Sequence, residues 1–125
     1  MVADPSENEY YELLAHGRAP QHFSAGDVIF REGDPGESMF LLRDGSVDLM
    51  DGDRVVETLS GRGLFGEMAV IDYESRSLTA VAATDAAVIE IPVRHFWVLV
   101  HETPYFARMV MSVMAKRLRE RGATA

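Results

Sequence analysis

The chain has 125 residues, of which 47% are hydrophobic and 26% are charged, and its formal net charge is −8 at pH 7. This length and apolar content are typical of one domain with its own core, so residues 1–125 are predicted to form a single domain. The sequence contains no cysteine, which excludes disulfides, thiolate zinc sites, iron–sulfur clusters and thiol nucleophiles. No signal peptide and no membrane-spanning apolar run are visible, so a cytoplasmic location is expected.

Charge is distributed unevenly along the chain. Residues 1–90 contain 18 acidic and 6 basic side chains, whereas residues 91–125 contain 2 acidic and 6 basic ones. The acidic part disfavours contact with nucleic acid or an anionic membrane. The basic residues at 116–121 are predicted to complement the dipole of a helix end and to lie in water. We therefore expect no DNA binding by this chain alone.

The first predicted element is a helix over residues 6–16. Ser6 is a suitable N-cap, and Tyr10, Leu13 and Leu14 fall on one face of that helix. This apolar face predicts packing against the rest of the domain.

Residues 20–91 show the sequence pattern of short β-strands separated by turns. Turn signals such as Asp44-Gly45 and Asp51-Gly52-Asp53 recur about every eight to ten residues, and an Asp-Gly pair between alternating runs is typical of a hairpin. Evenly spaced short strands with glycine turns favour an antiparallel roll or barrel. The strands are expected at residues 28–30, 39–43, 47–50, 54–59, 78–83 and 87–91.

Residues 93–121, after Pro92, are predicted to be helical. One short helix is expected at 94–102, and Thr103-Pro104 separates it from a longer helix that Gly122 ends. The longer helix carries a predicted core-facing apolar stripe, which consists of Phe106, Met109, Val110, Val113, Met114 and Leu118.

Residues 65–78 combine features suited to one phosphate and one sugar. Arg76 can offer a planar fork to two phosphate oxygens, and Ser77 adds a hydroxyl donor. A short helical turn opens at Gly66, where free backbone N–H groups favour an anion and the missing side chain allows close approach. Glu67 would accept a hydrogen bond from a sugar hydroxyl while Arg76 balances the charge. The predicted ligand-binding residues are Gly66, Glu67, Met68, Ala69, Arg76 and Ser77.

The same residues allow a purely structural interpretation. Gly66-Glu67 could open an ordinary helix in which the Glu67 carboxylate favours the helix dipole. Arg76 could be a solvated or salt-bridged surface arginine of little energetic value. The spacing alone does not choose between these interpretations.

Residues 65–78 resemble the phosphate-binding cassette of cyclic nucleotide-binding domains, a family found in catabolite activator protein, protein kinase A regulatory subunits and cyclic nucleotide-gated channels. The family pattern runs Phe-Gly-Glu-(Leu/Ile/Met)-Ala-(Leu/Val), a short loop, then Arg-(Ala/Ser/Thr), and Phe65–Val70 with Arg76-Ser77 match it. Ser75 stands where many members carry proline. Residues 25–40 and 41–49 resemble the family's first hairpin and the strand–turn–strand that follows.

The resemblance implies a mainly β fold, an antiparallel β-roll (double-stranded β-helix or jelly roll) with an N-terminal helix, a short phosphate-binding helix and C-terminal helices. It implies that Glu67 bonds the ribose 2′-hydroxyl and that Arg76 and Ser77 hold the cyclic phosphate. Gly66, Met68 and Ala69 would line the pocket through their backbone. Ser77 does not choose between cAMP and cGMP, although cAMP is favoured. The residues considered as a lid over the base are Met109, Val113, Met114 and Arg117.

No enzyme activity and no cofactor are expected. The histidines at 16, 22, 95 and 101 are scattered without a His-X-His pair, no Ser/His/Asp set is visible, and Gly61-Arg62-Gly63 lacks the Lys-Ser/Thr ending of a triphosphate-binding loop. Only three residues follow Gly122, too few for a helix-turn-helix module.

The predicted function is a regulatory module that binds a cyclic purine mononucleotide reversibly. Movement of the C-terminal helix would pass the signal to an effector protein or a second copy of the chain. Two alternatives stay open, a nucleotide-free scaffold of the same fold and a regulatory fragment of a larger channel, transporter or kinase.

Overall fold

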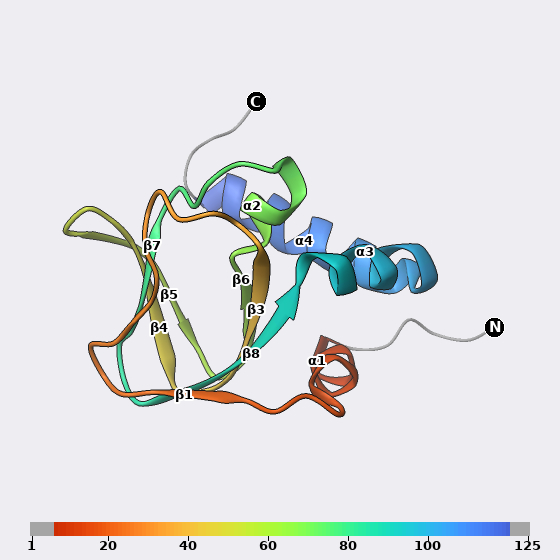
Figure 1. Ribbon diagram of the computed structural model, residues 1–125, viewed down its shortest axis with the longest axis horizontal. Helices are drawn as coiled ribbons and strands as arrows, with labels where there is room; N and C mark the ends of the chain where they lie inside the picture. The colour runs from red at the N-terminus through yellow and green to blue at the C-terminus, as the bar shows by residue number, and fades with distance from the viewer. Residues whose placement is uncertain (1–6, 121–125) are drawn as a thin grey trace.

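The computed structural model describes residues 7–120, and these form an eight-stranded antiparallel β-roll with four helices (Figure 1). The predicted mainly β fold with flanking helices is confirmed. The elements in chain order are α1 (Glu7–Ala15), β1 (Gln21–Phe23), β2 (Val28–Phe30), β3 (Ser38–Asp44), β4 (Ser46–Asp51), β5 (Arg54–Ser60), β6 (Gly63–Phe65), α2 (Glu67–Asp72), β7 (Thr79–Ala82), β8 (Ala86–Pro92), α3 (Val93–Glu102) and α4 (Pro104–Glu120).

The strands are arranged in two four-stranded sheets, ordered β1-β8-β3-β6 and β2-β7-β4-β5. Strand β3 is buried on both faces along residues 38–42. On β3, Met39 and Leu41 belong to one apolar cluster, whereas Phe40 and Leu42 belong to the other. This division follows from the period-two alternation of strand side chains.

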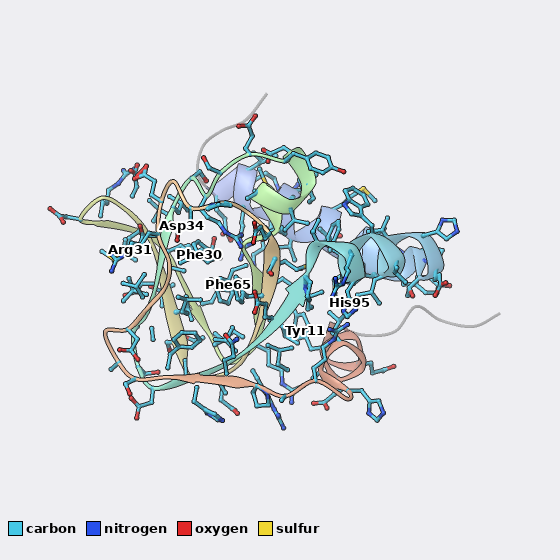
Figure 2. All side chains as sticks on the ribbon, viewed as in Figure 1. Tyr11, Phe30, Arg31, Asp34, Phe65 and His95 are labelled. Carbon is cyan, nitrogen blue, oxygen red and sulfur yellow. The ribbon has the colours of Figure 1, made fainter. Side chains whose placement is uncertain are left out.

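One apolar cluster fills the interior of the roll. Phe30 and Phe65 point into this space from β2 and β6 (Figure 2), and Phe40 stacks on Phe65 with ring centroids 5.4 Å apart. Its buried members are Phe30, Phe40, Leu42, Val47, Leu49, Leu59, Phe65, Ala80, Ala82, Ala86 and Val88.

The second cluster lies between the β3 sheet and the helices, which gather on one side of the roll in Figure 1. Phe96 of α3 and Phe106 of α4 meet there edge to face, with centroids 5.6 Å apart. Tyr11 and Leu14 of α1 close the same cluster. The helices therefore cover an apolar sheet face that would otherwise be exposed to water.

The predicted elements agree with most of this architecture, but two short strands were not predicted. Strands β1 (Gln-His-Phe) and β6 (Gly-Leu-Phe) have three residues each and, unlike the equally short β2 (Val-Ile-Phe), contain no β-branched residue. On α1, Tyr11 is buried beside the predicted Leu14, and the side chains of Tyr10 and Leu13 lie outside the described part of the chain. The predicted Ser6 cap and Gly122 stop lie outside it as well.

The predicted stripe on α4 is correct in its first half and wrong at its end. Phe106, Met109 and Val110 are buried, Val113 and Met114 are half-buried, but Leu118 is 46% exposed. Its neighbour Arg117 is the buried residue of the last turn, at 8% exposure. Among the described helices, none is both long and apolar enough to cross a membrane.

Candidate functional site

The six predicted site residues all line one cavity at the start of α2. Gly66, the N-cap of this helix, has φ of +77°, a left-handed conformation that side chains disfavour. A Cβ at this position would lie 2.8 Å from Nη1 of Arg76. The turn from β6 into α2 therefore requires glycine on two counts. The residues that line the cavity are Phe30, Leu49, Gly66, Glu67, Met68, Ala69, Arg76, Ser77, Leu78 and Arg117.

The backbone of Arg76 is fixed by the loop between β2 and β3. Its amide N–H donates to the carbonyl oxygen of Asp34 at 2.8 Å, and its carbonyl oxygen accepts from the N–H of Gly33 at 2.8 Å. Pro35 and Ser75 form a bridge beside this pair. Ser75 thus holds an extended position next to Arg76 without the proline that many family members carry there.

The side chain of Arg76 is directed into the protein and is only 5% exposed. Nη1 donates to the carbonyl oxygen of Gly66 at 2.7 Å, and Nη2 donates to that of Ser38 at 2.5 Å. The guanidinium carbon lies 4.3 Å from the ring centroid of Phe30 and 5.6 Å from that of Phe40. The interpretation of Arg76 as a solvated surface arginine is therefore wrong.

The charge of Arg76 is poorly balanced in the described part of the chain. Burial lowers the pKa of this guanidinium, and the more distant charges of Asp34, Glu90 and Glu67 offset the effect only in part. Within the described residues, no carboxylate forms a salt bridge with Arg76 and its buried Nε–H has no acceptor. A buried cation with an unused donor is costly, and a bound anion would relieve that cost.

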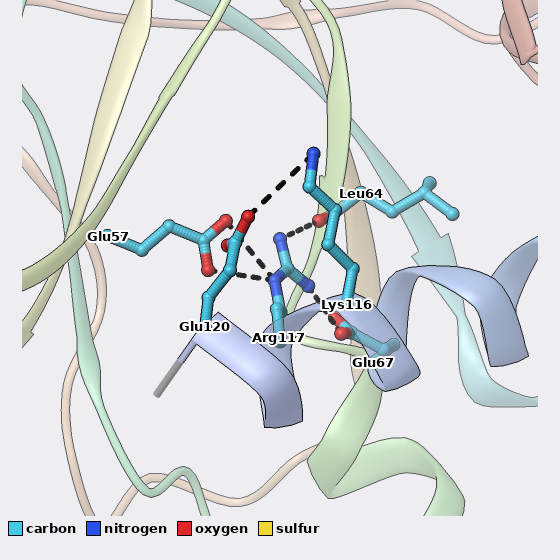
Figure 3. Close-up of polar contacts among 6 residues, drawn as sticks. All are labelled: Glu57, Leu64, Glu67, Lys116, Arg117 and Glu120. Atoms are coloured by element: carbon cyan, nitrogen blue, oxygen red, sulfur yellow. Dashed lines mark hydrogen bonds and ion pairs between the residues drawn. The ribbon is translucent and has the colours of Figure 1, made fainter. Parts of the chain in front are cut away.

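The cationic partner of Glu67 is Arg117 rather than Arg76. Glu67 is 1% exposed, and its Oε1 accepts a hydrogen bond from Nη1 of Arg117 (Figure 3). Arg76 acts on the Glu67 carboxylate through its charge at a distance and makes no salt bridge with it within the described residues, and its predicted role in balancing the summed charge of Glu67 and a ligand phosphate stays a prediction. The two side chains do not pair because the Nη groups of Arg76 face the carbonyls of Ser38 and Gly66, while α4 brings a second guanidinium to Glu67.

Arg117 is held by acceptors from three places in the roll. Besides Glu67, Nη2 donates to the carbonyl oxygen of Leu64, and Nε lies 3.0 and 3.2 Å from the two carboxylate oxygens of Glu57 on β5. Burial by itself would lower the pKa of Arg117, but the Glu67 and Glu57 carboxylates outweigh it and raise the pKa. The prediction that the 116–121 basic residues all lie in water is wrong for Arg117.

Of the four residues considered as a lid, Arg117 is the one that lines the cavity. Met109 and Met114 pack with the cluster between helices and sheet, and Val113 lines a separate groove beside β5. A spacing argument could have identified Arg117, because Phe106, Val110, Val113 and Arg117 follow one another at helical intervals of four, three and four. A charged residue at such a position indicates a buried ionic contact.

A β-roll with a cavity lined by a buried arginine, a buried glutamate and a short helix defines a small-ligand-binding domain. The chain belongs to the cyclic nucleotide-binding domain family, whose model matches residues 20–103.

The comparisons with curated proteins give relatives of several kinds. The cyclic AMP receptor protein of Thermus thermophilus is 32% identical over 124 residues, covering 86% of this chain and 57% of the relative. A cyclic nucleotide-gated potassium channel of Rhizobium etli is 34% identical and covers 78% of this chain and 27% of the channel. The chain thus spans about half, or less, of the length of these relatives.

Solved structures give the same fold. The crystal structure of Thermus thermophilus catabolite activator protein has a TM-score of 0.79 at 28% identity and covers 94% of this chain and 57% of that one. The structure of PKAR CBD2 with bound Sp-2Cl-cAMPS has a TM-score of 0.71 at 24% identity and covers 96% of this chain and 80% of that one. The second likeness supports the fold alone.

Proposed function

We propose that this domain reversibly binds a cyclic purine mononucleotide, cAMP in preference to cGMP, and acts as a regulatory module in the cytoplasm without a cofactor. The observation that carries the proposal is the buried guanidinium of Arg76, which forms no salt bridge within residues 7–120 and has an unpartnered Nε–H. A cyclic phosphate has one negative charge and two free oxygens, and it would satisfy this group. The activity proposed is binding and not catalysis.

The neighbouring residues are suited to the rest of such a ligand. The Ser77 hydroxyl lies in the same cavity as Arg76, and the Glu67 carboxylate can accept from a ribose hydroxyl. Leu49 and Leu78 give an apolar wall for the face of a purine ring. The preference for cAMP is supported by relatives named for that nucleotide, such as the cyclic AMP receptor protein.

The proposed output is a movement of α4. Arg117 connects this helix directly to Glu67, so a ligand hydroxyl that donates a hydrogen bond to Glu67 alters a contact that holds the helix. A ligand shifts the helix only if it favours one helix position over another. Met111 and Leu118, which are 62% and 46% exposed on α4, offer apolar surface for an effector protein or a second copy of the chain.

A nucleotide-free scaffold is the second candidate function, and one observation favours it. Glu67 already has a cationic partner in Arg117, so the carboxylate needs no ligand to be satisfied. The unpartnered Nε–H of Arg76 favours ligand binding instead.

Isothermal titration with cAMP, cGMP and cyclic dinucleotides separates the two functions. We expect heat on addition of cAMP, weaker binding of cGMP, and a loss of affinity of roughly 30-fold or more in Arg76→Ala. Arg76→Lys should also bind weakly, because a lysine keeps the charge but lacks the fork. Arg43→Ala removes an exposed arginine of β3 and should bind like the wild type. No heat with any of these ligands would favour the scaffold.

A further inference from the structure

The arginine that α4 brings to the cavity is neutralised by two carboxylates. One is Glu67, which lines the cavity, and the other is Glu57 of β5, which does not. Figure 3 shows the guanidinium of Arg117 between these two side chains, with the carbonyl of Leu64 at its remaining edge. Within residues 7–120, Arg117 is the residue that contacts Glu57 and also lines the cavity.

The position of Glu57 fixes how the guanidinium of Arg117 is oriented. Both of its carboxylate oxygens face Nε of Arg117, at 3.0 and 3.2 Å, so the two Nη groups are turned toward Glu67 and Leu64. The Glu57 side chain is 21% exposed and that of Arg117 is 9% exposed, which places the pair where water screens it only in part.

The charge of Glu57 also affects the net charge around the cavity, and therefore the binding of an anion. Arg76 and Arg117 contribute two positive charges, and Glu67 and Glu57 contribute two negative ones. These four side chains are neutral together, so an anionic ligand would add an unbalanced negative charge. Without the Glu57 carboxylate the remaining three would carry one positive charge, which favours an anion.

We propose that Glu57 is a positioning residue that holds Arg117 on Glu67 in the ligand-free domain and thereby weakens binding of the cyclic nucleotide. This inference rests on the proposed function. Arg117, oriented by Glu57, occupies the Glu67 carboxylate that a ligand hydroxyl would use, so affinity is set below what Arg76, Ser77 and Glu67 would give by themselves. The opposing effects of Glu57 on the empty and the occupied domain distinguish this role from simple structural support.

The first test is titration of cAMP into the wild type and Glu57→Gln in the same buffer. Glutamine keeps the shape of the side chain and removes its charge, and we expect roughly three- to tenfold tighter binding. The matched control is Glu120→Gln, which removes a carboxylate on α4 that pairs with Lys116 at 4.0 Å and lies in the same region in Figure 3. This control should change affinity by less than about twofold.

The second test measures urea unfolding of the same proteins without ligand. Glu57→Gln should unfold at a lower urea concentration than the wild type, because Arg117 loses a charged acceptor. The two measurements together test the positioning role. If Glu57 only supported the structure, Glu57→Gln would lower stability without raising the affinity for cAMP. In an Arg117→Met background, Glu57→Gln should have a smaller effect on affinity, because the change in charge remains but the contact that holds Arg117 on Glu67 is gone.

These experiments distinguish failure of the Glu57 inference from failure of the proposed cyclic nucleotide binding. If the wild type binds cAMP and Glu57→Gln binds equally or more weakly, this inference is overturned while the proposed function stands. If Glu57→Gln has the same effect on affinity with and without Arg117, Glu57 does not act through that arginine and the positioning role is overturned. If neither the wild type nor any variant binds a cyclic nucleotide, both proposals are overturned together.

Discussion

Two buried charges in one cavity are satisfied in different ways. The Glu67 carboxylate has a guanidinium in contact, whereas within residues 7–120 the Arg76 guanidinium contacts carbonyl oxygens and the ring faces of Phe30 and Phe40 and no carboxylate. Carbonyl dipoles and aromatic faces stabilise a cation less than a carboxylate does. The asymmetry leaves the site with an unmet preference for an anion at Arg76.

Gly66 makes this arrangement possible, because a side chain at this position would meet the Arg76 guanidinium. Gly66→Ala should destabilise the domain by about 2–4 kcal/mol, since it adds left-handed strain of about 1–2 kcal/mol and a contact with Arg76 and the Phe30 and Phe40 rings. Urea unfolding measures this. Gly52→Ala is the matched control, because Gly52 has φ of +61° but nothing within 4 Å of its would-be Cβ.

The control isolates the steric part of the effect. Gly52→Ala should cost only the backbone strain, about 1–2 kcal/mol. Equal losses in the two variants would mean that the crowding at Arg76 contributes nothing, which would contradict the packing described for the cavity.

At the scale of elements, the helix α4 serves two purposes along its length. Its first half buries Phe106, Met109 and Val110 against the β3 sheet, and its last turn carries Arg117 to the cavity. A single helix therefore connects the apolar cluster outside the roll with the polar contacts of the site.

This division of α4 gives a paired prediction. Phe106→Ala should cost about 3–5 kcal/mol, because Phe106 is fully buried between α3 and the sheet. Leu118→Ala should change stability by no more than about 0.5 kcal/mol, because Leu118 is exposed. Urea unfolding of both variants measures these changes in the free energy of unfolding. A large loss of stability in Leu118→Ala would mean that Leu118 packs in the core, as the sequence predicted.

The sequence predicts the elements with clear periodicity and misses those without it. The six predicted β runs and both C-terminal helices agree with the structure to within one residue or two, since glycine turns and a helical stripe mark them. The three-residue strands β1 and β6 owe their existence to pairing with distant strands, β8 and β3. No local pattern contains that information.

The candidate site divides in the same way. Gly66, Glu67, Arg76 and Ser77 are close in sequence and match a recognisable pattern, so their gathering in one cavity could be predicted. The contact between Arg117 and Glu67 joins residues 50 positions apart. It depends on where α4 crosses the roll, which is a property of tertiary packing. The ligand roles of the six residues stay predictions.

At the scale of the whole molecule, the site touches both apolar clusters. Arg76 lies on the rings of the inner cluster, and Arg117 extends from the helix that packs on the outer one. Trp97 of α3 stacks on Tyr73, which follows α2, with ring centroids 6.4 Å apart. Because Trp97 is the sole tryptophan of the chain, its fluorescence reports on the region where α2 meets α3.

A ligand that binds across these parts should stabilise all of them together. At a cAMP concentration about 100 times its Kd, binding adds about 2.7 kcal/mol to the free energy of unfolding. For a domain of this size we expect Tm to rise by about 10 °C. Thermal unfolding followed by far-UV circular dichroism and by Trp97 fluorescence should give one coincident transition with and without cAMP, as a two-state domain requires.

Arg76→Lys provides the comparison for this measurement. Its Tm should move by only a few degrees at the same cAMP concentration, because weaker binding reduces the concentration of ligand relative to Kd. An upward shift confined to the Trp97 signal would mean that the ligand stabilises the helical region without the roll. In that case the cavity would not couple the two clusters, and movement of α4 would have to be communicated by local contacts near Glu67 alone.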